Sequence, residues 1–155
     1  MTAAEILRRA REAEVMIATA ESCTGGMVAV ALTDLPGSSH VFERGFVTYS
    51  NAAKQELLGV RAETLEAHGA VSEEVAAEMV AGALARSRAQ LAVSITGIAG
   101  PGPSQHKPEG RVCFGLMRKG SAPDTETVEF GALGRARVRA AARDHALALL
   151  LKALS

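Results

Sequence analysis

The chain has 155 residues, and its seventeen basic and seventeen acidic side chains give a formal net charge of zero at neutral pH. This length suits one domain, so we expect residues 1–155 to share one core. Hydrophobic residues make up 48% of the chain, which excludes a disordered protein, and no apolar run reaches membrane-spanning length. The zero net charge and the absence of tryptophan argue against direct nucleic-acid binding, so we expect a small-molecule partner.

The amino terminus mixes charged residues into an apparent helix and lacks the apolar stretch of a secretory signal peptide. We therefore expect a cytoplasmic protein. Cys23 and Cys113 lie far apart and outside any metal-ligand spacing, which favours free thiols over a disulfide. The four histidines form no ligand pattern such as HExxH, so we predict no metal site.

The first third of the chain alternates between helical and strand patterns. Residues 3–14 are predicted to form a helix, because apolar residues recur at helical spacing among arginines. The short apolar run at 15–19 is rich in β-branched residues and predicts a buried strand. A helical pattern resumes at 27–32, a turn follows at 35–39, and residues 42–49 predict a second strand.

The middle of the chain is predicted to be mainly helical. A helix is expected from residue 51 to about 59, and a shorter one over 62–68. Ser72 is a natural N-cap for a long helix that ends near residue 86. Residues 91–95 then predict a third strand.

The last third begins with a flexible segment at 96–110 and closes with a long helix at 135–154. Between these two segments, an antiparallel pair of strands is predicted at 111–117 and 125–130. This order of elements predicts a three-layer α/β/α sandwich with a mixed, mostly parallel sheet of about five strands. Ligand crevices in such folds form at the strand ends, where three unusual loops are expected.

The first motif is Glu21-Ser22-Cys23-Thr24-Gly25-Gly26, where a predicted strand turns into a helix. The Ser22 hydroxyl is expected beside free backbone N–H groups at the positive end of the helix dipole. Such donors hold a phosphate or a tetrahedral oxyanion. Alternatively, Ser22 or Thr24 acts only as the N-cap. Cys23 is either a rival nucleophile, acidified by the helix, or a small buried hydrophobic residue.

The second motif is Thr48-Tyr49-Ser50-Asn51-Ala52-Ala53-Lys54. Asn51 is the expected N-cap, which places Lys54 in the first turn of a helix, at the unfavourable end of the dipole. That position lowers the pKa of the ammonium and suits a lysine that acts as a base. The alternative is a solvated surface lysine.

Two further segments offer ligand contacts. Residues 96–102 are rich in glycine and supply backbone N–H groups after a strand, although they match neither GxGxxG nor a P-loop. Arg135, Arg139 and Arg143 lie four residues apart along one face of the last helix, either to hold an anion or as a solvated face. Residues 104–107 spell S-x-x-K, but flanking prolines place them in a loop, which excludes that signature.

In combination, these segments resemble the CinA C-terminal domain family, the nicotinamide-nucleotide amidohydrolases. Any one stretch is weak, but five in the family's order across nearly the whole chain are highly specific. The matching stretches are AESCTGG at 20–26, FERGFVTYSN at 42–51, GAVS at 69–72, SITGIAGP at 94–101 and KPEGRV at 107–112.

The resemblance implies an α/β/α fold and hydrolysis of nicotinamide mononucleotide to nicotinate mononucleotide and ammonia, without a cofactor. It places the nucleophile at Ser22 and the catalytic lysine at Lys54, with Tyr49 as the matching tyrosine nearby. It also implies a homo-oligomer. The glycine-rich stretch after Pro101 departs from the family pattern at 103–106, which is expected to alter a loop over the site.

Contacts to the substrate are expected from both loops and from the last helix. Which loop serves the phosphate and which the oxyanion is left open. Two other functions are also open, namely a non-catalytic partner protein linked to competence or DNA damage, and an amidase of the same mechanism acting on another nucleotide amide. The expected contact residues are Thr24, Gly25, Gly26, Thr96, Gly97, Ala99, Gly100, Arg135 and Arg139.

Overall fold

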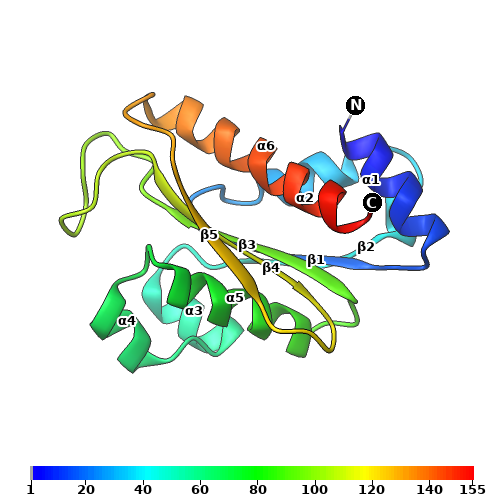
Figure 1. Cartoon of the computed structure of the whole chain (residues 1–155), viewed down its shortest axis with the longest axis horizontal. Coiled ribbons are helices and arrows are strands. Elements are labelled where there is room, and N and C mark those ends of the chain that lie inside the picture. The colour runs from blue at the N-terminus through cyan, green and yellow to red at the C-terminus, as the bar shows by residue number, and fades with distance from the viewer. Residues whose placement is uncertain (1) are drawn as a thin grey trace.

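The computed structural model describes residues 2–155 and shows a twisted sheet between two layers of helices (Figure 1). One layer of helices lies on the side of the sheet where both chain ends are found. This layer contains α1 (Thr2–Glu12), α2 (Met27–Thr33) and α6 (Arg135–Ala153). The opposite layer contains α3 (Asn51–Leu58), α4 (Ala62–His68) and α5 (Glu73–Ala85). Within the described residues, no helix is long and apolar enough to cross a membrane.

The sheet contains β1 (Ile17–Glu21), β2 (Phe42–Val47), β3 (Leu91–Gly97), β4 (Arg111–Arg118) and β5 (Asp124–Glu129). Its spatial order is β2-β1-β3-β4-β5. β1 pairs in parallel with β2 and β3, whereas β4 pairs antiparallel with β3 and β5. The predicted three-layer fold with a mixed five-stranded sheet is therefore confirmed. Two of the four neighbouring pairs are parallel, and only β4 runs against the common strand direction.

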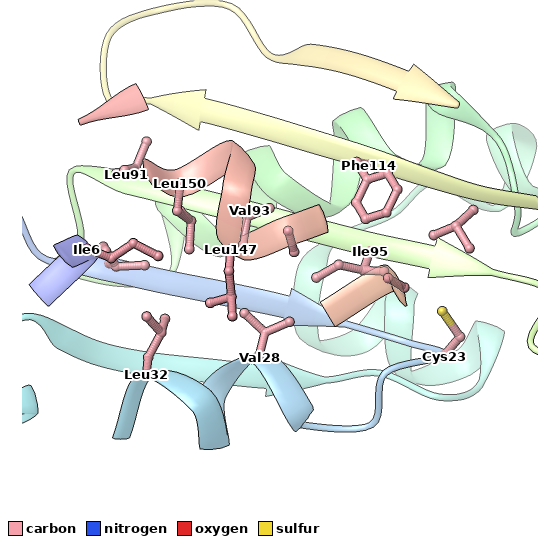
Figure 2. Close-up of a cluster of buried hydrophobic side chains, with 14 of the residues drawn as sticks. Ile6, Cys23, Val28, Leu32, Leu91, Val93, Ile95, Phe114, Leu147 and Leu150 are labelled. Atoms are coloured by element: carbon pink, nitrogen blue, oxygen red, sulfur yellow. The ribbon is translucent and has the colours of Figure 1, made fainter. Parts of the chain in front are cut away.

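The centre of the sheet is buried on both faces. All five residues of β1 are buried, with Ile17 in one hydrophobic cluster and Ala18 and Ala20 in another. One cluster lies under α1, α2 and α6 and includes Ile6, Val28, Leu32, Val93, Leu147 and Leu150 (Figure 2). The other lies under α3 and α5 and includes Leu58, Val75, Met79 and Val80. Each fully buried aliphatic side chain contributes about 1.5–3 kcal/mol relative to an exposed one.

Of two predicted boundaries, one differs from the structure and one agrees with it. The first strand begins at Ile17 rather than residue 15, because Glu14 is left-handed (φ 56°) and the Val15 N–H donates to the Ala10 carbonyl. The predicted cap Ser72 is confirmed, since its side chain accepts from the Val75 N–H at 3.2 Å.

The carboxyl ends of the three parallel strands meet at one edge of the sheet. Glu21, the last residue of β1, pairs with Val47 of β2 and with Ile95 of β3. The residues that follow these strands therefore come together, as expected for a ligand crevice in an α/β sheet. The loop between β3 and β4 extends beyond this edge, at the left of Figure 1.

Candidate active site

A cavity of about 290 Å³ opens at this edge of the sheet. Its walls come from the turn after β1, the start of α3, the segment before α5, the loop after β3 and the start of α6. The lining residues are Ser22, Cys23, Tyr49, Asn51, Lys54, Ala70, Val71, Thr96–Gly102, Pro103, Ser104, Gln105 and Arg135.

The Lys54 ammonium lies at the inner end of the cavity, in contact with Ser22. Its Nζ is 3.0 Å from the Ser22 Oγ and donates to the Thr48 carbonyl, also at 3.0 Å. Lys54 is only 2% exposed and Ser22 8% exposed. The cap of α3 is Ser50 rather than the predicted Asn51, because the Ser50 side chain accepts from the Ala53 N–H. Lys54 is therefore the fourth residue of the helix and faces inward.

Burial lowers the pKa of Lys54 from its ordinary value of 10.5, because the charged ammonium loses its water. Among residues 2–155, no carboxylate forms an ion pair with Lys54. Burial therefore shifts the balance toward the neutral amine, whose lone pair can accept the proton of the Ser22 hydroxyl while an N–H donates to Thr48.

The first turn of α2 is filled by a carboxylate from the chain itself. Glu21 is fully buried, and its two oxygens accept from the N–H groups of Gly26, Val28 and Ala29 at 3.0–3.2 Å. A carboxylate at a helix N-terminus is stabilised by the dipole and by these donors. The α2 terminus is consequently not open to a substrate anion, which differs from the sequence-based expectation.

Cys23 is packed in the hydrophobic cluster under α2 and α6, where Figure 2 shows its side chain at one end of the cluster. Burial raises the pKa of its thiol to about 12. The acidification expected at a helix N-terminus does not occur, because Glu21 already occupies the donors and water is excluded. The geometry thus favours the hydrophobic role. Cys113 is also buried, and both thiols are free.

Two backbone donors remain beside the Ser22 hydroxyl. The Ser22 N–H donates to the Ile95 carbonyl, and the Gly25 N–H to the Ser22 carbonyl. Within the described part of the chain, the N–H groups of Cys23 and Thr24 donate to no backbone carbonyl. The N–H of Cys23 belongs to the residue directly after Ser22, and in α/β-hydrolases the residue after the nucleophilic serine supplies an oxyanion donor.

Tyr49 and Arg135 form the outer wall of the cavity. The Arg135 guanidinium donates to the Tyr49 hydroxyl and, at 2.7 Å, to the Gly100 carbonyl. Tyr49 is 59% exposed, and its hydrogen bond goes to Arg135. The Tyr49 hydroxyl therefore bonds to Arg135, whereas the Lys54 amine bonds to Ser22 and Thr48.

The glycine-rich segment that begins at the end of β3 lines the cavity. Thr96, Gly97, Ala99 and Gly100 all contribute to its wall, and the buried Thr96 hydroxyl donates to the Ala70 carbonyl at 2.8 Å. That bond holds the segment before α5 against the end of β3.

Four of the predicted substrate contacts lie behind the cavity wall rather than on it. Arg139 donates to the carbonyls of Cys23 (3.0 Å) and Thr24 (3.5 Å), so it stabilises the turn that follows the Ser22 hydroxyl. The Thr24 side chain is fully buried, and Gly25 and Gly26 adopt positive φ angles that shape the turn. The structural reason is that Glu21 and Arg139 bond to the backbone of this turn, so the turn is part of the protein interior.

Some wall residues were missed by the sequence analysis. Asn51, Ala70 and Val71 line the cavity, and the segment 101–105 closes one side of it. The only sequence signal for Glu21 was its charge at the end of an otherwise apolar strand. Over residues 2–155, no group of three or more His, Cys, Asp or Glu side chains is gathered as a metal site.

The family model of the CinA C-terminal domain matches residues 1–154. The chain belongs to the CinA C-terminal domain family. This CinA-family chain is 46% identical to a competence/damage inducible protein, CihA, from Agrobacterium tumefaciens, with a TM-score of 0.94 over 99% of this chain and 93% of that one. A CinA superfamily protein from Escherichia coli is 37% identical, with a TM-score of 0.94 over 98% and 88%.

Curated relatives are similar over part of their length. The CinA-family chain is 64% identical over 99 residues to a nicotinamide-nucleotide amidohydrolase, PncC, from Escherichia coli K12, which is 63% of this chain and 60% of that protein. It is 56% identical over 144 residues to a CinA-like protein of Chlorobium phaeobacteroides, covering 90% of this chain but 34% of that protein. The chain thus spans between a third and three fifths of these relatives.

Proposed function

We propose that this protein hydrolyses the carboxamide of nicotinamide mononucleotide to nicotinate mononucleotide and ammonia. The observation that carries the proposal is the contact of a buried lysine of lowered pKa with a serine hydroxyl at a cavity. A serine beside a neutral amine is an activated nucleophile suited to acyl transfer. The 64% identity to PncC, which is named for this reaction, supports the choice of substrate.

In the proposed first step, the Ser22 hydroxyl gives its proton to the neutral Nζ of Lys54, and Oγ attacks the carboxamide carbon. The carbonyl oxygen becomes an oxyanion. When the C–N bond breaks, the Lys54 ammonium returns the proton to the leaving nitrogen, and ammonia departs. The result is an ester between Ser22 and the nicotinate carbonyl.

In the second step, Lys54 removes a proton from water, and the resulting hydroxide attacks the ester. The C–Oγ bond breaks, and the proton on Lys54 returns to Ser22. The product leaves as the carboxylic acid, which loses its proton to water or to the released ammonia, so one water is consumed and the enzyme regains its starting state. Both steps use the same short Ser22–Lys54 contact, which the Thr48 carbonyl orients.

The oxyanion is assigned to the N–H groups of Cys23 and Thr24, because the other donors of that turn are engaged by Glu21 or by carbonyls. The nucleotide phosphate is assigned to the outer wall, where Arg135 supplies a cation beside Tyr49. This division assigns the anion to Arg135 at the start of α6 and to the adjoining loop after β3, and the chemistry to Ser22 and Lys54.

Ammonia release from nicotinamide mononucleotide by the purified protein tests the proposal. A panel that includes other nucleotide amides separates it from an amidase of different specificity. A non-catalytic partner protein would release no ammonia from any of them. Release of ammonia from another amide in preference to nicotinamide mononucleotide would overturn the substrate assignment but would not contradict the proposed mechanism.

We further propose that residues 1–155 act as one domain. One continuous sheet uses strands from both halves of the chain, and the family model spans 1–154. Limited proteolysis would test this proposal, since a single domain releases no stable fragment of intermediate size.

A further inference from the structure

Glu109 lies behind the outer wall of the cavity and is not one of its lining residues. It belongs to the segment that leads into β4 and is partly buried. Its Oε1 accepts from the Gly102 N–H at 2.7 Å, and its Oε2 accepts from the Gly134 N–H at 2.9 Å. The carboxylate therefore joins two segments that are about thirty residues apart in the sequence.

Both segments carry parts of the proposed phosphate site. Gly134 directly precedes Arg135, the first residue of α6, and Gly102 ends the glycine-rich segment that lines the cavity. Arg135 in turn donates to the Gly100 carbonyl at 2.7 Å. Glu109 and Arg135 thus close a ring of contacts between the loop after β3 and the start of α6.

The packing at Gly100 shows how closely the carboxylate fits. Gly100 has a φ of 88°, and a Cβ atom there would lie 2.5–2.7 Å from the side-chain carbons and Oε1 of Glu109. Such contacts are far shorter than van der Waals distances, so the absence of a side chain at Gly100 is what admits the carboxylate. Glu109 therefore touches the loop at two points and the helix at one.

We propose that Glu109 is a positioning residue that sets the affinity for the anionic group of the substrate by holding Arg135 and Gly100 in register. This inference rests on the proposed function for the identity of the anion. A bare carboxylate this near would repel a phosphate, but both oxygens of Glu109 are engaged by backbone donors. We therefore expect the loss of positioning in a Glu109 variant to exceed any gain from removing its negative charge.

The substitution Glu109→Gln isolates this effect, because glutamine has nearly the same shape. Its amide oxygen can accept one of the two N–H groups, but its NH₂ group cannot accept the other. The variant therefore loses one contact of the ring. Glu109→Asp is a second variant, whose shorter side chain cannot span Gly102 and Gly134 together.

Calorimetry on the Ser22→Ala protein measures binding without turnover. We expect Glu109→Gln in that background to weaken the binding of nicotinamide mononucleotide about three- to tenfold, which is the effect of one ordinary hydrogen bond. The affinity for nicotinamide riboside should not change. In the active enzyme, KM for the nucleotide should rise while kcat stays constant, since Ser22 and Lys54 do not touch Glu109. Glu109→Asp should act in the same direction.

Glu129→Gln is the matched control, because Glu129 is an exposed carboxylate on β5 that pairs with Arg111 and lies outside the cavity wall. This variant should not change the affinity for either ligand. Tighter nucleotide binding by Glu109→Gln, equal losses for nucleotide and riboside, or no nucleotide binding to the Ser22→Ala protein would overturn the proposal. A wild-type protein that releases no ammonia, although its Ser22→Ala variant binds the nucleotide, would contradict only the proposed function.

Discussion

The inner and outer ends of the cavity differ in their access to water. At the inner end, Ser22 and Lys54 are almost completely buried, and the pKa of the lysine is lowered by that burial. At the outer end, Tyr49 and Arg135 are exposed, and their contacts are with each other and with a backbone carbonyl. Burial suits a proton transfer, whereas an exposed guanidinium suits the capture of an anion from solution. The two ends should therefore respond differently to substitution.

The largest effect is expected at the inner end. Ser22→Ala should lower kcat by about a thousandfold or more, because no nucleophile remains to form the ester. Binding of nicotinamide mononucleotide, measured by calorimetry, should persist because the outer end is intact. Activity within tenfold of wild type would remove Ser22 as the nucleophile.

The outer end should control affinity rather than chemistry. Arg135→Ala is expected to weaken the binding of the nucleotide by roughly ten- to a hundredfold, which corresponds to a charge-assisted hydrogen bond of about 1.5–3 kcal/mol. The affinity for the riboside should not change. Arg139→Ala provides the contrast, because its guanidinium bonds to Cys23 and Thr24 carbonyls behind the wall. Its losses should be equal for both ligands in kcat/KM measurements. A nucleotide-selective loss in Arg139→Ala would return that residue to the phosphate site.

Lys54 should also make the stability of the protein depend on pH. Below the folded-state pKa of Lys54, both folded and unfolded chains carry the ammonium, and the folded state bears the burial penalty. Between that pKa and the ordinary 10.5, the unfolded chain binds a proton that the folded chain does not, so stability rises with pH.

Comparison with Lys54→Met isolates this contribution, because methionine fills the site without a charge. From pH 7 to 10.5, the free energy of unfolding of the wild type should increase relative to that of the variant. The increase should be about 1.4 kcal/mol for each pH unit between the folded-state pKa of Lys54 and 10.5. Urea unfolding at several pH values measures it. A constant difference between the two proteins across that range would show that the Lys54 pKa is not lowered.

The smallest effect is expected from Cys23→Ala. The thiol is buried in the hydrophobic cluster and its pKa is raised to about 12, so it supplies no thiolate for catalysis. Most of the wild-type turnover should remain, with a modest loss of stability from the small cavity. A folded, substrate-binding but inactive variant would transfer the nucleophile from Ser22 to Cys23.

The elements of the fold were predictable because their signals are local. The apolar periodicity of α6, the Ser72 cap of α5 and the β-branched residues before Glu21 are all readable along the chain. The alternation of strands and helices predicted that the three motif loops lie at strand ends, and the cavity opens there. What local patterns do not contain is the partner of each polar group across the fold.

Glu21 illustrates this limit most clearly. The sequence predicts a free set of N–H donors in the turn after β1, but the preceding carboxylate folds back and occupies three of them. The same limit applies to Tyr49, whose hydroxyl meets Arg135 from 86 residues away. Local patterns predicted that these residues lie near the site, but only the tertiary structure shows whether each faces the cavity or supports its wall.

The pH dependence of kcat/KM, measured in parallel for wild type and Lys54→Arg, tests the central claim most directly. The neutral amine of Lys54 is the active form, so wild-type kcat/KM should rise with pH through a pKa below 10.5 and then level. Lys54→Arg should lose about a hundred- to ten-thousandfold at every pH, because guanidinium stays protonated. A wild-type profile that falls as pH rises through this range, or substantial turnover by Lys54→Arg, would contradict the assignment of Lys54 as the base.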